Sequence, residues 1–348
     1  MNRVWKHRLF WPVVTLVLLL VLNAAFNPGF LRVTVRDGHL YGSLIDILKG
    51  AAPLALVALG MTLVIATRGI DISVGAVVAI AGGVAAWMIG GSLVIHDGVS
   101  THVSRFPMPV AILCALLVAM LCGAWNGALV AWVGMQPIIA TLILMVAGRG
   151  VAQLITNGQI ITVYYAPYFT IGNGYVLGLP VPFLLAAAVF VALLLLVRRT
   201  ALGLFIEAVG INPAAAHLAG LPARRITFWA YVFCGLCAGI AGLIVSSTVK
   251  SADGNNAGML MELDAILAVT LGGTSLTGGR FSLAGTVVGA LVLQTLTYAI
   301  YSVGVPPEVN LVVKAAVVFA VMLLQSPEFR QALAQWARRP LPVQEATR

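Results

Sequence analysis

Long runs of apolar residues recur along the whole chain and constrain its fold more than any other feature. Two of them, residues 109–133 and 176–197, contain no charged side chain. A helix needs about 20 apolar residues to cross the hydrocarbon core of a bilayer. Of the 348 residues, 61% are hydrophobic and 9% are charged, whereas a soluble domain carries about 25% charged residues. The sequence therefore predicts an integral membrane protein.

The apolar runs predict an all-α, polytopic membrane protein with about ten transmembrane or half-membrane helices. The expected segments are residues 10–27, 51–67, 74–95, 109–133, 137–156, 176–197, 226–248, 258–275, 284–303 and 309–325. The second and eighth are short, so eight or six spans remain possible. Residues 40–50 mix apolar and charged positions, which is typical of an interfacial helix. This divides the chain into residues 1–50, a membrane core over 51–325 and a tail over 326–348.

Clusters of Lys and Arg mark the cytoplasmic side of membrane proteins. They occur in residues 1–8, in the segment 198–225 and in the tail 326–348. Ten spans place all three on one side, so we expect both termini and residues 198–225 in the cytoplasm. The uncharged stretch from Thr156 to Val176 is then outside. Because this topology explains the net charge of +9, we expect the lipid bilayer as a partner and no nucleic acid.

Two glycine-rich breaks interrupt the apolar runs in a similar way. The first, "ATRGIDISVGA" (66–76), contains Arg68 and Asp71, and the second lies within "LAVTLGGTSLTGGRFSLAGTVVGALVL" (267–293) with Arg280. Short, Gly-interrupted segments in corresponding halves of a chain are typical of a translocation pathway and of an internal pseudo-repeat. Asp71 or Ser73 can cap the helix that follows. A pair of ordinary cytoplasmic turns is the alternative interpretation.

Charged residues also occur inside or near the apolar runs. Arg149 and Lys314 interrupt two of them, and Glu262 and Asp264 lie at the start of another. An unpaired charge in lipid costs several kcal/mol, so these side chains are expected to face the protein interior. We expect Arg149 to pair with Asp264 or Glu262. Such a pair could line the pathway, or it could only hold helices together.

Small residues at helical spacing suggest close packing of helices. Gly123 and Gly127 flank Asn126 in "GAWNG", and "GLCAG" (235–239) and "GTVVG" (285–289) repeat the G-x-x-x-G spacing. Small residues allow close helix approach, and an Asn can donate a hydrogen bond across the contact. Cys234 and Cys237 have metal-ligand spacing but no second ligand pair nearby, so we interpret them as small packing residues.

The segment 198–225 is expected to form a compact cytoplasmic knob of two short helices. Asn212 is a good N-cap and Pro213 a good first helical residue, while Gly210 and Gly220 are expected to end the two helices. Such a knob could dock on a cytosolic partner, or it could be a connector that binds nothing. The candidate docking residues are Glu207, Gly210, Asn212, Pro213, Ala215 and Gly220.

No catalytic, cofactor or metal motif occurs in the sequence. It contains neither H-E-x-x-H nor the G-K-[ST] of a phosphate-binding loop. The chain is therefore not expected to be an enzyme, and any use of ATP has to come from another protein.

Three long blocks resemble the permease subunits of bacterial ABC sugar importers of the ribose type. They are "GMTLVIATRGIDISVGAVVAIAG" (60–82), "TALGLFIEAVGINPAAAHLAGLPARR" (200–225) and "ELDAILAVTLGGTSLTGGRFSLAGTVVGALVL" (262–293). Within that family, "LILMVAGRGVAQLIT" (142–156) is most similar to a galactofuranose importer permease. The resemblance implies a permease core over residues 51–325, a partner ATPase, a periplasmic sugar-binding protein, a second permease subunit and a bacterial inner membrane.

We therefore expect a transmembrane permease for a monosaccharide. The alternative is a secondary sugar transporter driven by protons or sodium, which usually has a carboxylate deep within a span. The candidates for the pathway or its gates are Arg68, Asp71, Asn126, Arg149, Glu262, Asp264 and Arg280.

Overall fold

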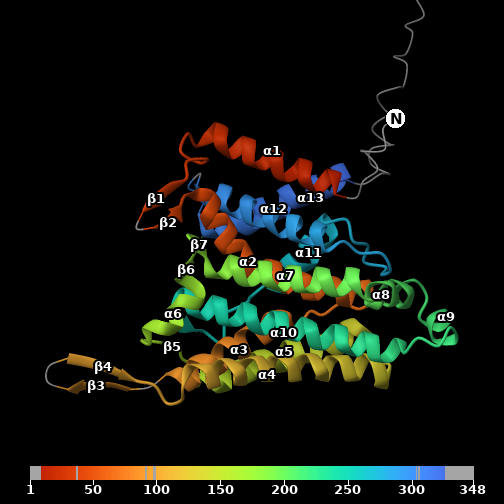
Figure 1. Ribbon diagram of the computed structural model, residues 1–348, viewed down its shortest axis with the longest axis horizontal. Coiled ribbons are helices and arrows are strands. Elements are labelled where there is room, and N and C mark those ends of the chain that lie inside the picture. The colour runs from red at the N-terminus through yellow and green to blue at the C-terminus, as the bar shows by residue number, and fades with distance from the viewer. Residues whose placement is uncertain are drawn as a thin grey trace, which may run out of the picture.

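The computed structural model describes residues 9–36, 38–90, 92–96, 99–302, 304 and 306–325. The basic residues 1–8 and the tail 326–348 lie outside this part of the chain. The long helices run roughly parallel to one another in a stack, with α1 at one edge and α4 at the other (Figure 1). The helices are α1 (Phe10–Phe26), α2 (Ser43–Ala66), α3 (Val74–Ile89), α4 (Met108–Ala128), α5 (Pro137–Thr156), α6 (Ala166–Asn173), α7 (Val181–Arg199), α8 (Leu202–Ile211), α9 (Pro213–Leu218), α10 (Ala223–Val249), α11 (Met261–Leu271), α12 (Leu283–Ser302) and α13 (Pro307–Gln325).

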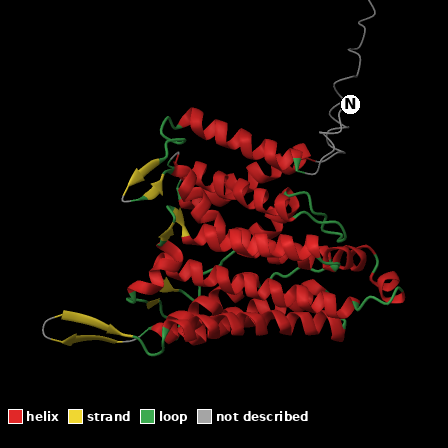
Figure 2. Ribbon diagram, in the orientation of Figure 1, coloured by secondary structure: helices red, strands yellow, loops and turns green. Residues whose placement is uncertain are grey.

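Short antiparallel strands gather at one end of the stack, and α8 and α9 lie at the other (Figure 2). β1 pairs with β2, β3 with β4, β6 with β7, and β5 with the distant β8. The strands are β1 (Thr34–Arg36), β2 (His39–Tyr41), β3 (Ser92–His96), β4 (Val99–Val103), β5 (Ile161–Thr162), β6 (Tyr175–Val176), β7 (Leu179–Pro180) and β8 (Ser251–Ala252). The start of α1 lies at the same end as α8 and α9.

Within the described residues, six helices are long and apolar enough to cross a membrane: α2, α4 with its π-helical end, α5, α7, α10 and α12. The predicted helical, polytopic membrane protein is therefore confirmed. α1 and α3 are shorter, with 17 and 16 residues. α11 has only 11 residues, which is about half of what a bilayer crossing needs.

The prediction of a separate interfacial helix over residues 40–50 is wrong. β2 covers its start, and Ser43 then begins α2, which continues without a break past Pro53 to Ala66. The charged residues that suggested an interface lie in the first two turns of α2. There, the Lys49 Nζ atom donates a hydrogen bond of 2.9 Å to the Asn173 side chain, and Asp46 lies in the first turn, where the helix dipole favours a negative charge.

α2 and α10 form the centre of the stack. α2 is buried along nearly all of residues 51–66, and α10 packs against α2, α3 and α4. The predicted glycine contacts explain how closely these helices approach. A side chain at Gly123 of α4 would meet the Tyr231 carbonyl of α10, and one at Gly235 would meet the Ala119 carbonyl. The motifs "GAWNG" and "GLCAG" therefore lie in a single α4–α10 contact.

The third motif, "GTVVG", has the same role in the contact between α12 and α11. A side chain at Gly289 would meet the carbonyl of Ala268, and one at Gly285 the carbonyl of Gly272. The two close cysteines are also packing residues as expected, because Cys234 and Cys237 are free and buried.

Candidate functional site

A buried polar network fills the first break, between α2 and α3. Asp71 is only 1% exposed, and its Oδ1 atom accepts hydrogen bonds from the Ser73 backbone N–H at 3.0 Å and from the Ser73 hydroxyl at 2.6 Å. The Asn126 side chain of α4 donates to the Ser73 hydroxyl at 2.8 Å and to Asp71 at 3.3 Å. Asn126 thus bonds to the first break, whereas Gly123 and Gly127, the glycines of its motif, face α10; the predicted hydrogen bond across the glycine contact is wrong. The predicted cap of α3 by Asp71 or Ser73 is wrong, because Asp71 bonds to Ser73, the residue before α3, and no described side chain caps the helix itself.

Arg68 connects this break to the knob. Its Nε atom donates to the Gly210 carbonyl at 2.6 Å, and a terminal nitrogen donates to the Ile211 carbonyl. These carbonyls belong to the last turn of α8, where backbone acceptors have no partner inside the helix. Arg68 also has a positive φ of 67°, which costs a non-glycine residue about 1–2 kcal/mol. The contacts with α8 stabilise this conformation.

The second break, between α11 and α12, meets the first one at the same place. The Gly279 N–H donates to the Ala66 carbonyl at 2.9 Å. A side chain at Gly210 would meet both of these groups, so only glycine allows α8 to approach the two breaks. Arg280 is exposed and lines a cavity of about 430 Å³ beside Ile211. The structure thus brings together Arg68, Gly210 and the Arg280 loop, which the sequence suggested separately.

The knob has most of the predicted details. The Asn212 side chain caps α9 by accepting from the Ala214 and Ala215 N–H groups, both at 3.1 Å, and Pro213 is the first residue of α9. Gly220 has a φ of 83° and follows the helix end as predicted. The prediction that Gly210 ends α8 is wrong, because α8 continues to Ile211. Glycine at this position instead allows close contact with the backbones of Ala66 and Gly279.

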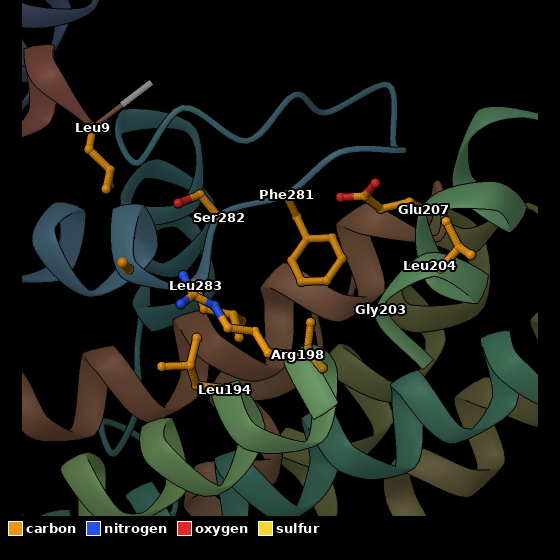
Figure 3. A pocket seen from close by; sticks show the side chains of 11 residues that line it. Leu9, Leu194, Arg198, Gly203, Leu204, Glu207, Phe281, Ser282 and Leu283 are labelled. Carbon is orange, nitrogen blue, oxygen red and sulfur yellow. The ribbon is translucent and has the colours of Figure 1, made fainter. Parts of the chain in front are cut away.

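Glu207 occupies a different environment from the rest of the knob. It lines a cavity of about 620 Å³ with Arg198 of α7 and Phe281 of the second break. Figure 3 shows these side chains around the same hollow, with Leu204 and Gly203 of α8 at its wall. The surface of α9, by contrast, is open, and Leu218 is 88% exposed. Glu207 therefore faces a cavity between α7, α8 and the second break.

The predicted pairing of Arg149 with Asp264 is wrong. Arg149 of α5 donates instead to the Ala257 carbonyl at 2.6 Å and to the Gly254 carbonyl at 3.4 Å. Asp264 forms an ion pair of 2.6 Å with Lys314 of α13. Helix geometry explains the exchange: Glu262 and Asp264 are two positions apart on α11, so they point to different sides.

Glu262 is buried against α3 on the other side of α11. It is 5% exposed, and a side chain at Gly75 would meet its Oε2 atom. That oxygen has no hydrogen-bond partner among the described residues. The charge of Arg149 is close enough to interact with Glu262, but the structure describes no direct hydrogen bond between them. The sequence did not predict this separation of the two acids.

The loop that Arg149 holds is ordered further by Asp253. Its carboxylate accepts from the Asn255 N–H at 2.8 Å and from the Asn256 side chain at 2.7 Å. Burial alone would raise the pKa of Asp253, but these hydrogen bonds, together with the charge of Arg149, hold this pKa below its usual value. These contacts therefore favour the ionised form of Asp253.

A polar cavity of about 340 Å³ lies beside this loop, between α2, α10, α11, α12 and α13. Asp264 and Lys314 line it together with Gln294 and Thr297 of α12. Sequence reasoning missed Gln294 and Thr297. They lie three residues apart, which places them on one face of α12. Two polar residues at this spacing can also simply pack against a neighbouring helix, so the spacing alone does not indicate a cavity.

The charged side chains of the site bind neighbouring loops and helices. The described residues contain no group of three or more His, Cys, Asp or Glu side chains that could hold a metal ion. The charged groups instead hold loops and helix breaks in place.

Comparison with known proteins identifies the class. Residues 43–322 match the family model described as "Branched-chain amino acid transport system / permease component". The chain is 51% identical over 329 residues to the galactofuranose transporter permease protein YtfT of Escherichia coli (strain K12), with 93% of each chain covered. It is 38% identical to the fructose import permease protein FruF of Bifidobacterium longum (strain NCC 2705), with 97% of this chain and 93% of FruF covered.

The ribose import permease protein RbsC of Escherichia coli (strain K12) is 35% identical, with 90% of this chain and 92% of RbsC covered. No solved structure matches the chain. The chain belongs to the family of branched-chain amino acid transport system permease components. It is a multi-pass, non-catalytic membrane subunit of an ABC importer, a class that works with an ATPase and a binding protein, and it is homologous to bacterial inner-membrane permeases.

Proposed function

We propose that this permease imports a monosaccharide, with galactofuranose as the first candidate. The observation that carries the proposal is the 51% identity to a galactofuranose transporter permease over 93% of both chains. The 38% and 35% identities to fructose and ribose permeases support a monosaccharide more generally. The sugar reaches the permease from a periplasmic binding protein, and a separate ATPase drives the cycle.

The knob is the docking site for that ATPase. Its helix α9 projects from the stack (Figure 1), and the exposed Leu218 and Ile211 offer apolar surface to a partner. Arg68 connects the end of α8 to the first break, so displacement of α9 is transmitted to α2 and α3. A second permease subunit, identical or different, completes the importer.

The knob and both termini lie on the cytoplasmic side in this proposal. The basic residues Arg198 and Arg199 end α7, and Arg224 and Arg225 lie in the first turn of α10, all at the end of the stack where α8 and α9 lie. Such basic ends are typical of the cytoplasmic face. Cysteines placed at Leu177 (95% exposed) and Leu218 (88% exposed) should be labelled by a membrane-impermeant maleimide only from outside and only from inside, respectively; the reverse pattern would contradict the topology.

The candidate residues then have different parts in the pathway. Arg68 and Arg280 lie next to the knob, Asp71 and Asn126 lock the first break, and Arg149, Glu262 and Asp264 organise the opposite end of α11. The two breaks meet at the Ala66–Gly279 hydrogen bond, which supports an internal pseudo-repeat, although α2 before the first break has 24 residues and α11 before the second has 11.

Uptake by the reconstituted importer tests this function. The permease, its ATPase and its binding protein are placed in proteoliposomes, and uptake of radiolabelled D-galactose, D-fructose and D-ribose is measured with and without ATP inside. We expect ATP-dependent uptake of one of these sugars. Uptake that follows an imposed proton or sodium gradient without ATP would instead support the secondary transporter.

A further inference from the structure

We propose that the cavity lined by Asp264, Gln294, Thr297 and Lys314 is a sugar-binding site within the permease. The inference rests on the proposed function, and it names the residues that contact the cargo on its way through. The cavity has a volume of about 340 Å³, near the small end of the range of about 300–1,000 Å³ for ligand sites. It therefore suits one sugar ring.

The charges of the cavity select a neutral ligand. Lys314 and Asp264 lie 2.6 Å apart and neutralise each other, and their side chains are 15% and 29% exposed. A site for an anion or a cation would leave one charge in excess. The pair also keeps unused capacity, because an ammonium has three donors and a carboxylate has two oxygens. Both can therefore bind hydroxyl groups while they remain paired.

The neutral polar groups complement these charges. Gln294 can donate and accept, and the Thr297 hydroxyl, which donates to the Leu293 carbonyl at 2.9 Å, still has free lone pairs to accept from a ligand. A sugar hydroxyl is both a donor and an acceptor, so it matches this mixture. The Gln294 amide lies directly against Gly50 of α2, where a side chain would collide with its nitrogen.

Apolar side chains form the rest of the wall. Leu54, Val245, Met259, Met261 and Leu293 line the cavity, and they can pack against the C–H faces of a sugar ring. A ligand with polar edges and an apolar face fits such a wall better than an inorganic ion would.

Arg149 is the positioning residue for one side of the cavity. It binds the Ala257 carbonyl at 2.6 Å, and the adjacent Asn256 and Gly258 line the cavity. Arg149 itself is not among the lining residues. Its effect on the sugar is therefore exerted through the loop.

The test compares Thr297→Val with the matched control Thr270→Val in the reconstituted importer. Thr270 of α11 makes the same kind of bond to a carbonyl in its own helix, at 3.0 Å, but it does not line this cavity. Loss of one hydrogen bond corresponds to about a 2- to 10-fold effect. We expect Thr297→Val to lower sugar uptake by about that factor, while Thr270→Val stays within about 2-fold of wild type.

Gly50→Leu is a second variant, designed to fill the cavity. We expect it to lower uptake by more than about 10-fold while ATP hydrolysis stimulated by the binding protein continues, because the knob is unchanged. Membrane assembly with the ATPase is checked by co-purification. Normal uptake in both Thr297→Val and Gly50→Leu overturns the cavity proposal. A wild-type importer that takes up none of the three sugars overturns the proposed function, and the cavity proposal with it.

Labelling gives a readout that does not depend on transport. A cysteine replacing Thr297 should react with a small methanethiosulfonate, and a saturating concentration of the transported sugar should slow that reaction by at least about 3-fold. A cysteine replacing Thr270 serves as the control. If the sugar leaves the reaction at Thr297→Cys unchanged, the cavity is not its binding site.

Discussion

The two helix breaks resemble each other in sequence but differ in how the structure holds them. In the first break, Asp71 and Ser73 are buried and hydrogen-bonded to Asn126. In the second, most residues from Gly273 to Thr277 are exposed, and so is Arg280. Gly272 leaves room for the backbone of Gly285 there, and Gly278 leaves room for Arg68. The first break is thus tied to α4, whereas the second is held by hydrogen bonds within its own residues, from the Ser282 N–H to Thr274 Oγ1 at 3.2 Å and between the Ser275 and Thr277 hydroxyls at 2.8 Å.

This difference suggests separate roles in a transport cycle. The first break has an internal lock that resists rearrangement, and it is attached to the knob through Arg68. The second break is held by hydrogen bonds within its own residues and is joined to the first through the backbone hydrogen bond from Gly279 to Ala66. We therefore expect the second break to move first when α8 moves.

The largest effect is expected where both breaks meet α8. Gly210→Val would push the Ala66 carbonyl and the Gly279 N–H apart, at a cost of more than about 3 kcal/mol because backbone atoms cannot rotate away. Thermal unfolding of the purified protein and coupled uptake should both show this loss. Gly150→Ala, with no atom near the added methyl group, is the control and should be neutral or slightly stabilising. An unaffected Gly210→Val would show that the breaks and α8 are not in close contact.

The next effect separates the two breaks directly. Asp71→Ala leaves the buried donors of Ser73 and Asn126 without their shared acceptor, at a cost of about 1–3 kcal/mol. Arg280→Ala at an exposed position should change stability by less than about 0.5 kcal/mol. Thermal unfolding in detergent ranks the two. Equal losses would mean that Arg280 stabilises the second break as strongly as Asp71 stabilises the first.

A smaller effect distinguishes the two functions of Arg68. Arg68→Ala removes its hydrogen bonds but keeps the unfavourable positive φ, whereas Arg68→Gly removes both. The glycine variant should therefore be about 1 kcal/mol more stable than the alanine variant. Both should lose coupling between ATP hydrolysis and uptake. If either couples normally, Arg68 does not transmit motion from the knob.

The smallest effect concerns the loop before α11, at the end of that helix opposite the second break. Because the folded state holds the Asp253 pKa below its usual value near about 4, its ionised form stabilises the fold above about pH 4. This stabilisation is lost as the pH falls through the lower folded pKa. The difference in unfolding temperature between wild type and Asp253→Asn should therefore shrink below about pH 4. A constant difference would mean that the carboxylate charge is not involved.

Much of the fold follows from the sequence because apolar length and glycine spacing have direct structural consequences. The helical segments, the glycine contacts of α4 with α10 and of α12 with α11, and the Asn212 cap are all local patterns. The start of α2 was missed because Asp46 and Lys49 suggested an interface, although Lys49 bonds to Asn173, which is 124 positions away. Such a contact has no local signal.

The site was predictable in its residues but not in its pairings. Arg149, Asp264 and Lys314 stand out as charges in apolar surroundings, yet the partner of each depends on which faces of α5, α11 and α13 meet. Arg149 finds carbonyls of a loop, and Asp264 finds Lys314. Gln294 and Thr297 carry no charge and were not noticed, because only the surrounding helices make a cavity beside them.

The position of α1 has a consequence for how the chain is made. α1 packs chiefly on α12, which lies more than 250 residues later in the sequence. The ribosome therefore synthesises α1 long before α12, its main neighbour. Its backbone hydrogen bonds are satisfied within the helix, and exposed Val and Leu side chains cover its surface. The helix can therefore remain stable in lipid before α12 is present. Contacts so distant in sequence form slowly, and a chain released before α12 would leave α1 without a place to dock.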